Sequence, residues 1–180
     1  MKAAPPPNRA TTGNTNIPHP GITSFNTRSL STHAKGVGGK ERKSRVIKFI
    51  RQLAAKSDVI CLQETNLGSL DKRALTEDFP NHLVFHNPLK FGTAGSAILV
   101  STKYARNYTV EEVPLGERAK GRVQALRFLP AKDFLGGAHT VCNVYLLADN
   151  ANGRIQCLEM IKGLHWSPVP GRGLQLHLRH

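Results

Sequence analysis

The sequence predicts an α/β fold, and three features support this expectation. A strand-like run at residues 22–26, an amphipathic segment at 46–54 and an apolar run at 58–64 form a strand–helix–strand unit. Short β-branched runs follow, separated by Gly, Pro or charged residues. A second amphipathic segment lies at 154–164. Together these features predict one helix-linked strand pair followed by a β-rich region.

The elements follow one another in a simple order. Residues 1–20 are rich in Pro, Asn, Thr and Gly, which predicts a flexible arm, and the fold is expected to begin at Gly21. After the 58–64 strand, further strands are expected at 82–86, 94–101, 108–113, 122–129 and 140–147. The last helix is expected to bury one face, formed by Ile155, Leu158 and Ile161. Residues 166–180 fit no element.

Length and charge limit the function classes. The chain has 180 residues, which is typical of one domain. It carries 25 Lys and Arg against 12 Asp and Glu, a net charge of +13, and residues 1–40 contain no acidic residue. This excess favours a polyanionic partner, with nucleic acid ahead of an acidic membrane surface. The alternative is a basic surface that is simply solvated.

Several other classes are excluded by the sequence. No apolar run approaches the ~18 residues of a membrane-spanning helix, and three consecutive prolines stand where a secretory signal needs an apolar core. We therefore expect an intracellular chain without membrane segments. Cys61, Cys142 and Cys157 are odd in number and far apart, so neither a disulfide framework nor a closed zinc site is expected.

A phosphate-binding loop of the nucleotide-triphosphatase type is also excluded. Residues 36–40 (GVGGK) resemble such a loop, but Ala34 stands where its first Gly is needed and Glu41 where Ser or Thr should bind metal. The eight histidines include no H-E-x-x-H, so zinc catalysis has no support. No small-molecule cofactor is expected.

Two polar residues end neighbouring predicted strands. Glu64 follows the apolar run 59–62, and a carboxylate at that end of a buried strand suits a hard cation such as Mg²⁺. The alternative for Glu64 is an acidic residue that ends the strand in solvent. Asn26 ends the first strand, where its amide would hydrogen-bond a phosphate, orient Glu64 or form an Asx turn.

Two further candidates lie in the β-rich region. Strand alternation places Asn143 and Tyr145 on one face, and the Tyr145 phenol would donate to a phosphate oxygen. The alternative is an ordinary half-buried tyrosine. Arg122 starts a predicted strand and would face a polyanion at its rim, although a plain surface arginine is the commoner explanation.

Five segments in order resemble the endonuclease/exonuclease/phosphatase superfamily over residues 21–164. They are SFNTRSL at 24–30, ICLQET at 60–65, GSAILVS at 95–101, GRV at 121–123 and NVYL at 143–146. The forms Asn-x-Arg-Ser-Leu and Gln-Glu-Thr-Asn-Leu resemble most the apurinic-type endonuclease domain of non-LTR retrotransposons. Repair enzymes of that type carry Asp where this chain has Arg28.

The resemblance implies a two-sheet α/β sandwich and cleavage of DNA phosphodiesters that depends on Mg²⁺ (or Mn²⁺), in the nucleus. It implies that Glu64 binds the metal, that Asn26 positions metal and phosphate, and that Tyr145 contacts the scissile phosphate. We expect Arg28 and Arg122 to contact nucleic acid. Two alternatives stay open: a non-catalytic basic protein that binds nucleic acid, and a phosphatase of the same superfamily.

The sequence departs from this superfamily at its end. Members continue into a Gly-Asp-Phe-Asn segment, whose carboxylate acts on the attacking water, and into a Ser-Asp-His segment; neither occurs here. We therefore expect a truncated, inactive fragment with the C-terminal part of the sandwich missing and sheet edges exposed. Codons for residues 172–177 also permit Gly-Asp-Phe-Asn in another frame. Our hypothesis is that residues 165–180 form an out-of-frame tail.

Overall fold

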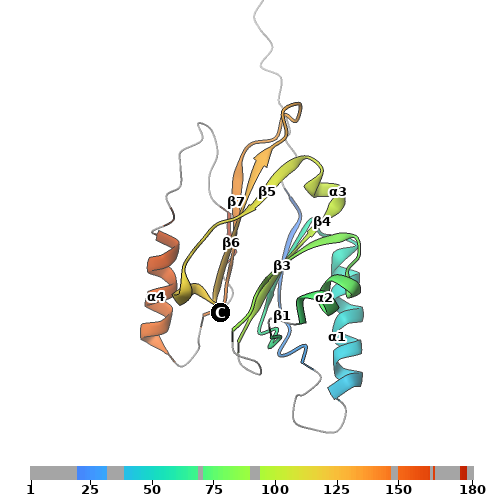
Figure 1. Ribbon diagram of the computed structural model, residues 1–180, viewed down its shortest axis with the longest axis vertical. Coiled ribbons are helices and arrows are strands. Elements are labelled where there is room, and N and C mark those ends of the chain that lie inside the picture. Colours follow the sequence, from blue (N-terminus) through green and yellow to red (C-terminus); the bar gives the residue numbers. More distant parts are fainter. Residues whose placement is uncertain are drawn as a thin grey trace, which may run out of the picture.

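Two β-sheets pack face to face, and helices cover the two outer sides (Figure 1). The structure is a computed structural model that describes residues 20–31, 39–68, 71–89, 94–146, 150–162 and 164, and the backbone of 175–177. The predicted two-sheet α/β sandwich is therefore confirmed. Almost all of the predicted N-terminal arm and most of the predicted tail lie outside the described residues.

The first sheet contains the strand–helix–strand unit. Its strand order is β1-β2-β4-β3, formed by β1 (Ile22–Asn26), β2 (Val59–Gln63), β4 (Ser96–Ser101) and β3 (His82–Asn87). β1 and β2 are parallel because α1 (Gly39–Ala54) carries the chain back between them, and the other neighbours are antiparallel. Asn26 lies opposite Gln63 in this register, so both strands end at the same edge.

β2 is buried on both of its faces. Ile60 and Leu62 pack under the helices on the outer side, whereas Val59 and Cys61 point between the two sheets. This two-sided burial explains why the strand appears in the sequence as a continuous apolar run rather than an alternating one. The first polar position after it, Glu64, emerges at the sheet edge and is only half buried.

The second sheet has the order β5-β6-β7-β8. Its strands are β5 (Tyr108–Glu112), β6 (Val123–Pro130), β7 (His139–Val144) and β8 (Gln175–His177). β8 is parallel to β7 and pairs Gln175 with Val141, so the expectation that residues 166–180 fit no element was wrong for 175–177. Three residues are too few for a periodic pattern to predict them.

In the described part of the chain, three short helical segments lie between the strands. α2 (Lys72–Asp78) lies beside α1 on the outer side of the first sheet, while α3 (Thr102–Ala105) and a 3-10 turn (Glu117–Ala119) are single turns (Figure 1). The sequence predicted none of these three. α2 has only seven residues and buries Leu75 alone, which leaves no amphipathic period. No described helix is long and apolar enough to cross a membrane.

The last helix, α4 (Ala151–Lys162), buries only Ile161 of the three residues that were predicted to form its buried face. Cys157 and Ile161 are its buried residues, whereas Ile155 is 56% exposed and Leu158 is 38% exposed. Residues four apart lie on one stripe of a helix, and the 157–161 stripe is the one that packs on the second sheet with Val144. Apolar residues occur on several sides of this helix, so periodicity alone did not select the buried one.

Candidate active site

Glu64 and Asn26 meet where β1 and β2 end. The Asn26 Nδ2 atom donates to Glu64 Oε1 over 2.8 Å, and Asn26 Oδ1 accepts from the Arg28 backbone N–H over 2.9 Å. The Asn26 amide therefore orients the Glu64 carboxylate and also forms an Asx turn into the following loop. Because Asn26 Oδ1 already accepts from a backbone N–H, the Glu64 carboxylate is the group of this pair that offers oxygen ligands to a cation.

The backbone around this pair adopts unusual conformations. Arg28, Ser29, Glu64 and Asn66 all have positive φ angles, of 49°, 89°, 50° and 50°. Such conformations cost of order 1–3 kcal/mol each and persist only where surrounding contacts enforce them. Here the Ser29 N–H and the Thr27 hydroxyl both donate to the Glu64 carbonyl, at 2.8 and 2.9 Å. These bonds turn Glu64 out of the sheet at a fixed position.

Tyr145 and Arg122 face each other at the matching end of the second sheet. The Tyr145 N–H donates to the Arg122 carbonyl over 2.8 Å, and the guanidinium carbon lies 5.0 Å from the centroid of the phenol ring. This distance is that of a cation–π contact. The Arg122 Nη1 atom is buried and has no hydrogen-bond partner in the structure. Since buried donors are rarely left unpaired, this atom is suited to an incoming anion.

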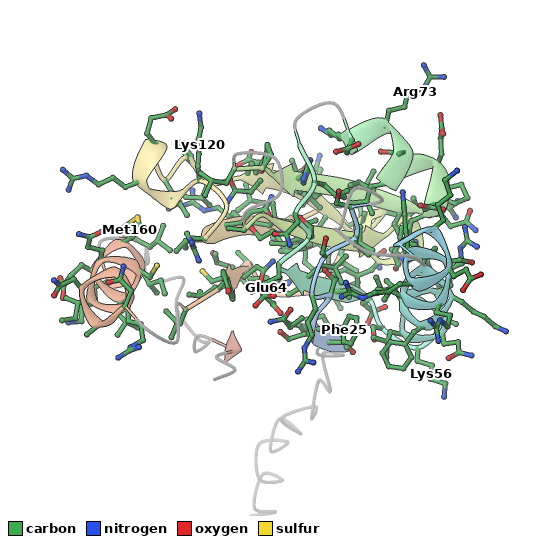
Figure 2. All side chains as sticks on the ribbon, turned by 90° about the horizontal axis from the view of Figure 1, so that it is seen from below. Phe25, Lys56, Glu64, Arg73, Lys120 and Met160 are labelled. Carbon is green, nitrogen blue, oxygen red and sulfur yellow. The ribbon has the colours of Figure 1, made fainter. Side chains whose placement is uncertain are left out.

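Glu64 and Tyr145 are close enough to affect one another across the two sheets. Burial raises the pKa of the Tyr145 phenol above its ordinary value, a hydrogen bond to Glu64 and the charge of Glu64 raise it further, and Arg122 opposes the rise. The phenol is therefore a proton donor at neutral pH. Viewed from the end where these strands finish, Glu64 lies near the middle of the molecule (Figure 2).

Four of the five predicted site residues therefore lie together: Asn26, Glu64, Arg122 and Tyr145. The fifth, Arg28, is exposed, and only its backbone N–H is joined to this group, through Asn26. We call the four residues the Glu64 cluster. It combines one carboxylate with an amide, a phenol and a guanidinium.

Asn87 holds Arg122 in place, although the sequence analysis did not single it out. Its Nδ2 donates to the carbonyls of Ala119 and Val123, at 3.2 and 2.9 Å, and its Oδ1 accepts from the Gly121 N–H at 3.1 Å. These bonds fix the turn that precedes β6. The signal available in the sequence was an Asn-Pro pair after an apolar strand, which is typical of a turn.

Gln63 and Asn143 are two further residues that the sequence did not assign to the site. Gln63 directly precedes Glu64 in the chain, Asn143 stands two residues before Tyr145, and the two side chains are buried and hydrogen-bonded to one another. Alternation predicted that Asn143 lies on the same face as Tyr145. It could not show that this face meets the end of β2.

The oxygen donors of the Glu64 cluster suit a divalent cation that has further ligands. Mg²⁺ is commonly held by one or two protein carboxylates, with water and phosphate oxygens completing its shell. Glu64 supplies one carboxylate, while no group of three or more His, Cys, Asp or Glu side chains suited to a metal occurs among the described residues. The cluster therefore fits a cation that is held jointly with a phosphate, and the unpaired Arg122 donor fits that phosphate.

Comparison with solved structures finds similarity to an AP endonuclease and to two forms of TDP2. The chain is similar to AP endonuclease LMAP from Leishmania major, with 22% identity, a TM-score of 0.51, and coverage of 70% of this chain and 40% of that one. It also matches D. rerio TDP2 humanized by 14 mutations, with 15% identity, a TM-score of 0.49, and coverage of 78% and 56%. The match to D. rerio TDP2 complexed with single strand DNA product has 13% identity and a TM-score of 0.48, and it covers 78% of this chain and 52% of that one.

The chain thus spans about half the length of these structures or less. No curated protein gives a significant match to the sequence. The Endonuclease/Exonuclease/phosphatase family matches residues 23–175, which include β1 from its second residue, every strand from β2 to β7 and the whole Glu64 cluster. With this match and the two-sheet sandwich, the chain belongs to the Endonuclease/Exonuclease/phosphatase family.

Proposed function

We propose that this chain retains the metal- and phosphate-binding part of a DNA endonuclease of the retrotransposon type, and that it binds DNA without efficient hydrolysis. The observation that carries the proposal is the Glu64 cluster, in which one oriented carboxylate lies beside a phenol and an unpaired guanidinium donor. Membership of a family that includes endonucleases and phosphatases supports phosphodiester or phosphate chemistry.

Each residue of the cluster has a distinct proposed role. Glu64 would hold the divalent cation, which supplies charge neutralisation at the phosphate when bound. Asn26 keeps the Glu64 carboxylate oriented through its 2.8 Å hydrogen bond. Tyr145, protonated at neutral pH, would donate to one phosphate oxygen, and Arg122 Nη1 would donate to another.

The side chains of the Glu64 cluster also lead us to expect inefficient hydrolysis. Activation of the attacking water needs a second group that accepts its proton, and among the described residues Glu64 is the one carboxylate in the cluster. The remaining groups stabilise charge but accept no proton from water. Stabilisation of phosphate charge without a base gives binding in preference to turnover.

DNA is the proposed substrate because of charge and local sequence. The net charge of +13 favours a polyanion, and the segments around Arg28 and Thr65 resemble the retrotransposon endonuclease form. The AP endonuclease of similar fold is consistent with this proposal.

The test compares metal-dependent DNA binding with plasmid nicking. We expect Mg²⁺ or Mn²⁺ to increase the affinity of the chain for a DNA duplex, and Glu64→Gln to remove this increase. We also expect nicking of supercoiled plasmid to stay near background. Rapid nicking that Glu64→Ala abolishes would show a complete catalytic site. Nicking that survives Glu64→Ala would show a contaminant or a different site.

A second candidate function is non-catalytic, metal-independent binding of nucleic acid. The observation that favours it is the basic composition of the chain, which has 25 Lys and Arg and 12 Asp and Glu. Basic side chains contact phosphates without any metal. It predicts DNA affinity that falls steeply with salt and is equal in the wild-type chain and in Glu64→Gln. The same binding experiment therefore separates the two candidates.

A further inference from the structure

A basic groove runs along α1, outside the Glu64 cluster. The groove has a volume of about 490 Å³ and is lined by four basic side chains and one acidic one, together with Ser44 and Ile47. The charged residues are Lys40, Lys43, Lys48, Arg51 and Asp78. Lys40 and Lys48 are exposed, and Lys43 is half buried. The groove is therefore open to a large ligand and strongly positive.

The single acidic residue of the groove is already neutralised. Arg51 Nη2 lies 3.1 Å from Asp78 Oδ1, and Arg51 Nε donates to the Asp78 carbonyl over 3.2 Å. The ion pairs found in the described part of the chain give no acidic partner to Lys40, Lys43 or Lys48. Three uncompensated ammonium groups on one face of a helix create a field that attracts phosphates.

The groove begins at the end of the molecule that carries the Glu64 cluster. In the first turn of α1, the Arg42 guanidinium donates to the Arg28 carbonyl, two residues beyond Asn26. From Lys40 to Arg51 the helix extends about 17 Å, which is the axial length of about five base pairs of duplex DNA. A nucleic-acid strand held at Glu64 would therefore have room to continue along α1.

A neighbouring hollow of about 680 Å³ shares Arg51 and Asp78 with the groove but has a different character. It contains Lys56 and Lys103, yet it also contains Asp58, whose carboxylate accepts from the Gly21 N–H over 2.9 Å. Its charges are nearly balanced. The uncompensated positive charge is thus concentrated between Lys40 and Lys48, and the anion site is assigned to that part alone.

We propose that the Lys40–Lys43–Lys48 groove binds the phosphodiester backbone of the DNA that flanks the Glu64 cluster. The partner class rests on the function proposed above. The groove itself rests on an independent observation, the three uncompensated lysines on α1. It recognises phosphates as charges and reads no bases, so it contributes affinity without sequence preference.

The experiment measures the affinity for a DNA duplex as a function of salt. The test variant replaces Lys40, Lys43 and Lys48 by Gln. The matched control replaces Arg127, Lys132 and Lys162 by Gln, because these residues are exposed, carry the same charge and lie on or beside the other sheet and on α4. Each lost phosphate contact lowers the slope of log affinity against log salt by about 0.9.

We expect the slope to fall by about 2–3 in the groove variant and to change by less than about 1 in the control. Equal slopes of log affinity against log salt in the two variants would contradict the proposal that the groove binds DNA. So would a groove variant that keeps its DNA slope but loses binding to phosphatidylserine vesicles, since that would assign the face to a membrane surface. Circular dichroism spectra of both variants check that the fold is retained.

A Glu64→Gln arm separates this proposal from the proposed function. Suppose that Mg²⁺ increases the DNA affinity of the wild-type chain, that Glu64→Gln removes this increase, and that the groove variant leaves the salt slope unchanged. DNA binding by the groove is then wrong, and the proposed metal-binding function stands. If the groove variant lowers the slope but Glu64→Gln has no effect, the groove stands and the metal-binding function is wrong.

Discussion

Gln63 and Asn143 join the two sheets through a buried hydrogen bond, in which Gln63 Nε2 donates to Asn143 Oδ1 over 2.7 Å. Asn143 Nδ2 also donates to the carbonyls of Leu62 and Ala97, at 2.9 and 3.0 Å. Gln63 directly precedes Glu64, and Asn143 stands two residues before Tyr145. This contact therefore fixes the separation between the carboxylate and the phenol of the Glu64 cluster.

Asn143→Ala should destabilise the protein strongly. The substitution leaves the buried Gln63 amide and two carbonyls with one hydrogen bond fewer each, and an unsatisfied buried polar group costs about 1–3 kcal/mol. We expect a loss of about 2–4 kcal/mol in the free energy of unfolding, measured by urea denaturation. Asn152→Ala, on the exposed side of α4, serves as the control. A loss below about 1 kcal/mol would show that the contact is replaced by water.

Tyr145 should titrate as a member of the Glu64 cluster. Burial and the Glu64 carboxylate raise the pKa of the Tyr145 phenol, whereas Arg122 lowers it. We therefore expect Glu64→Gln to bring this pKa down and Arg122→Gln to bring it up. Ultraviolet titration of tyrosinate measures both shifts when the Tyr145→Phe titration is subtracted. An unchanged pKa in both variants would mean that these side chains are not neighbours of the phenol.

The protein should lose stability in alkaline solution through its buried thiols. Burial raises the pKa of Cys61 from 9.0 to about 12, with a smaller contribution from Cys142, and burial raises that of Cys142 to about 11. A raised folded-state pKa gives stability that is complete below pH 9 and is lost as the pH rises towards 11–12. We expect Cys142→Ala to flatten the pH dependence of unfolding in this window. An identical pH dependence in the wild-type chain and in Cys142→Ala would contradict the role of the Cys142 thiol.

The turn that carries Arg122 should require glycine for two separate reasons. Gly121 has a φ of +67°, and a Cβ there would lie 2.6 Å from the Leu89 Cβ. Gly116 has a similar φ of +74° but no atom within 4 Å of such a Cβ. Gly116 also has ψ 178°, a backbone region that is almost exclusive to glycine, so Gly116→Ala should cost the backbone strain alone, about 1–3 kcal/mol. Gly121→Ala should cost about 1–3 kcal/mol more through the contact with Leu89. Urea denaturation checks the difference, and equal losses would contradict the contact.

Much of the fold was predictable because its strands are short, apolar and separated by turn residues. β1 and β2 were predicted nearly to their observed bounds, since the apolar run of β2 is a strong local signal. The amphipathic period predicted only the part of α1 at 46–54, whereas the helix begins at Gly39, because its first two turns are charged and polar and carry no apolar period. α2 was missed because it has one buried residue, and the buried face of α4 was predicted correctly only at Ile161, because apolar residues occur on several sides of that helix. β8 depends on pairing with β7 rather than on its own pattern.

The site was predictable where polar residues end apolar strands. Asn26 and Glu64 stand at such ends, and parallel pairing of their strands brings them into contact. Asn87 and the Gln63–Asn143 contact were not predictable, because both depend on how the two sheets pack, which no local pattern contains. The unpaired Arg122 donor likewise became visible only with the fold.

The most direct test of the account is Mn²⁺ binding to the complex of this chain with duplex DNA, measured by electron paramagnetic resonance. We predict that Glu64→Gln weakens Mn²⁺ binding at least tenfold and that Asn26→Ala, which releases the carboxylate from its 2.8 Å hydrogen bond, weakens it about tenfold. Glu77→Gln, an exposed carboxylate on α2, should leave it unchanged. Equal Mn²⁺ affinity in the wild-type chain and in Glu64→Gln would contradict the metal-binding role of Glu64.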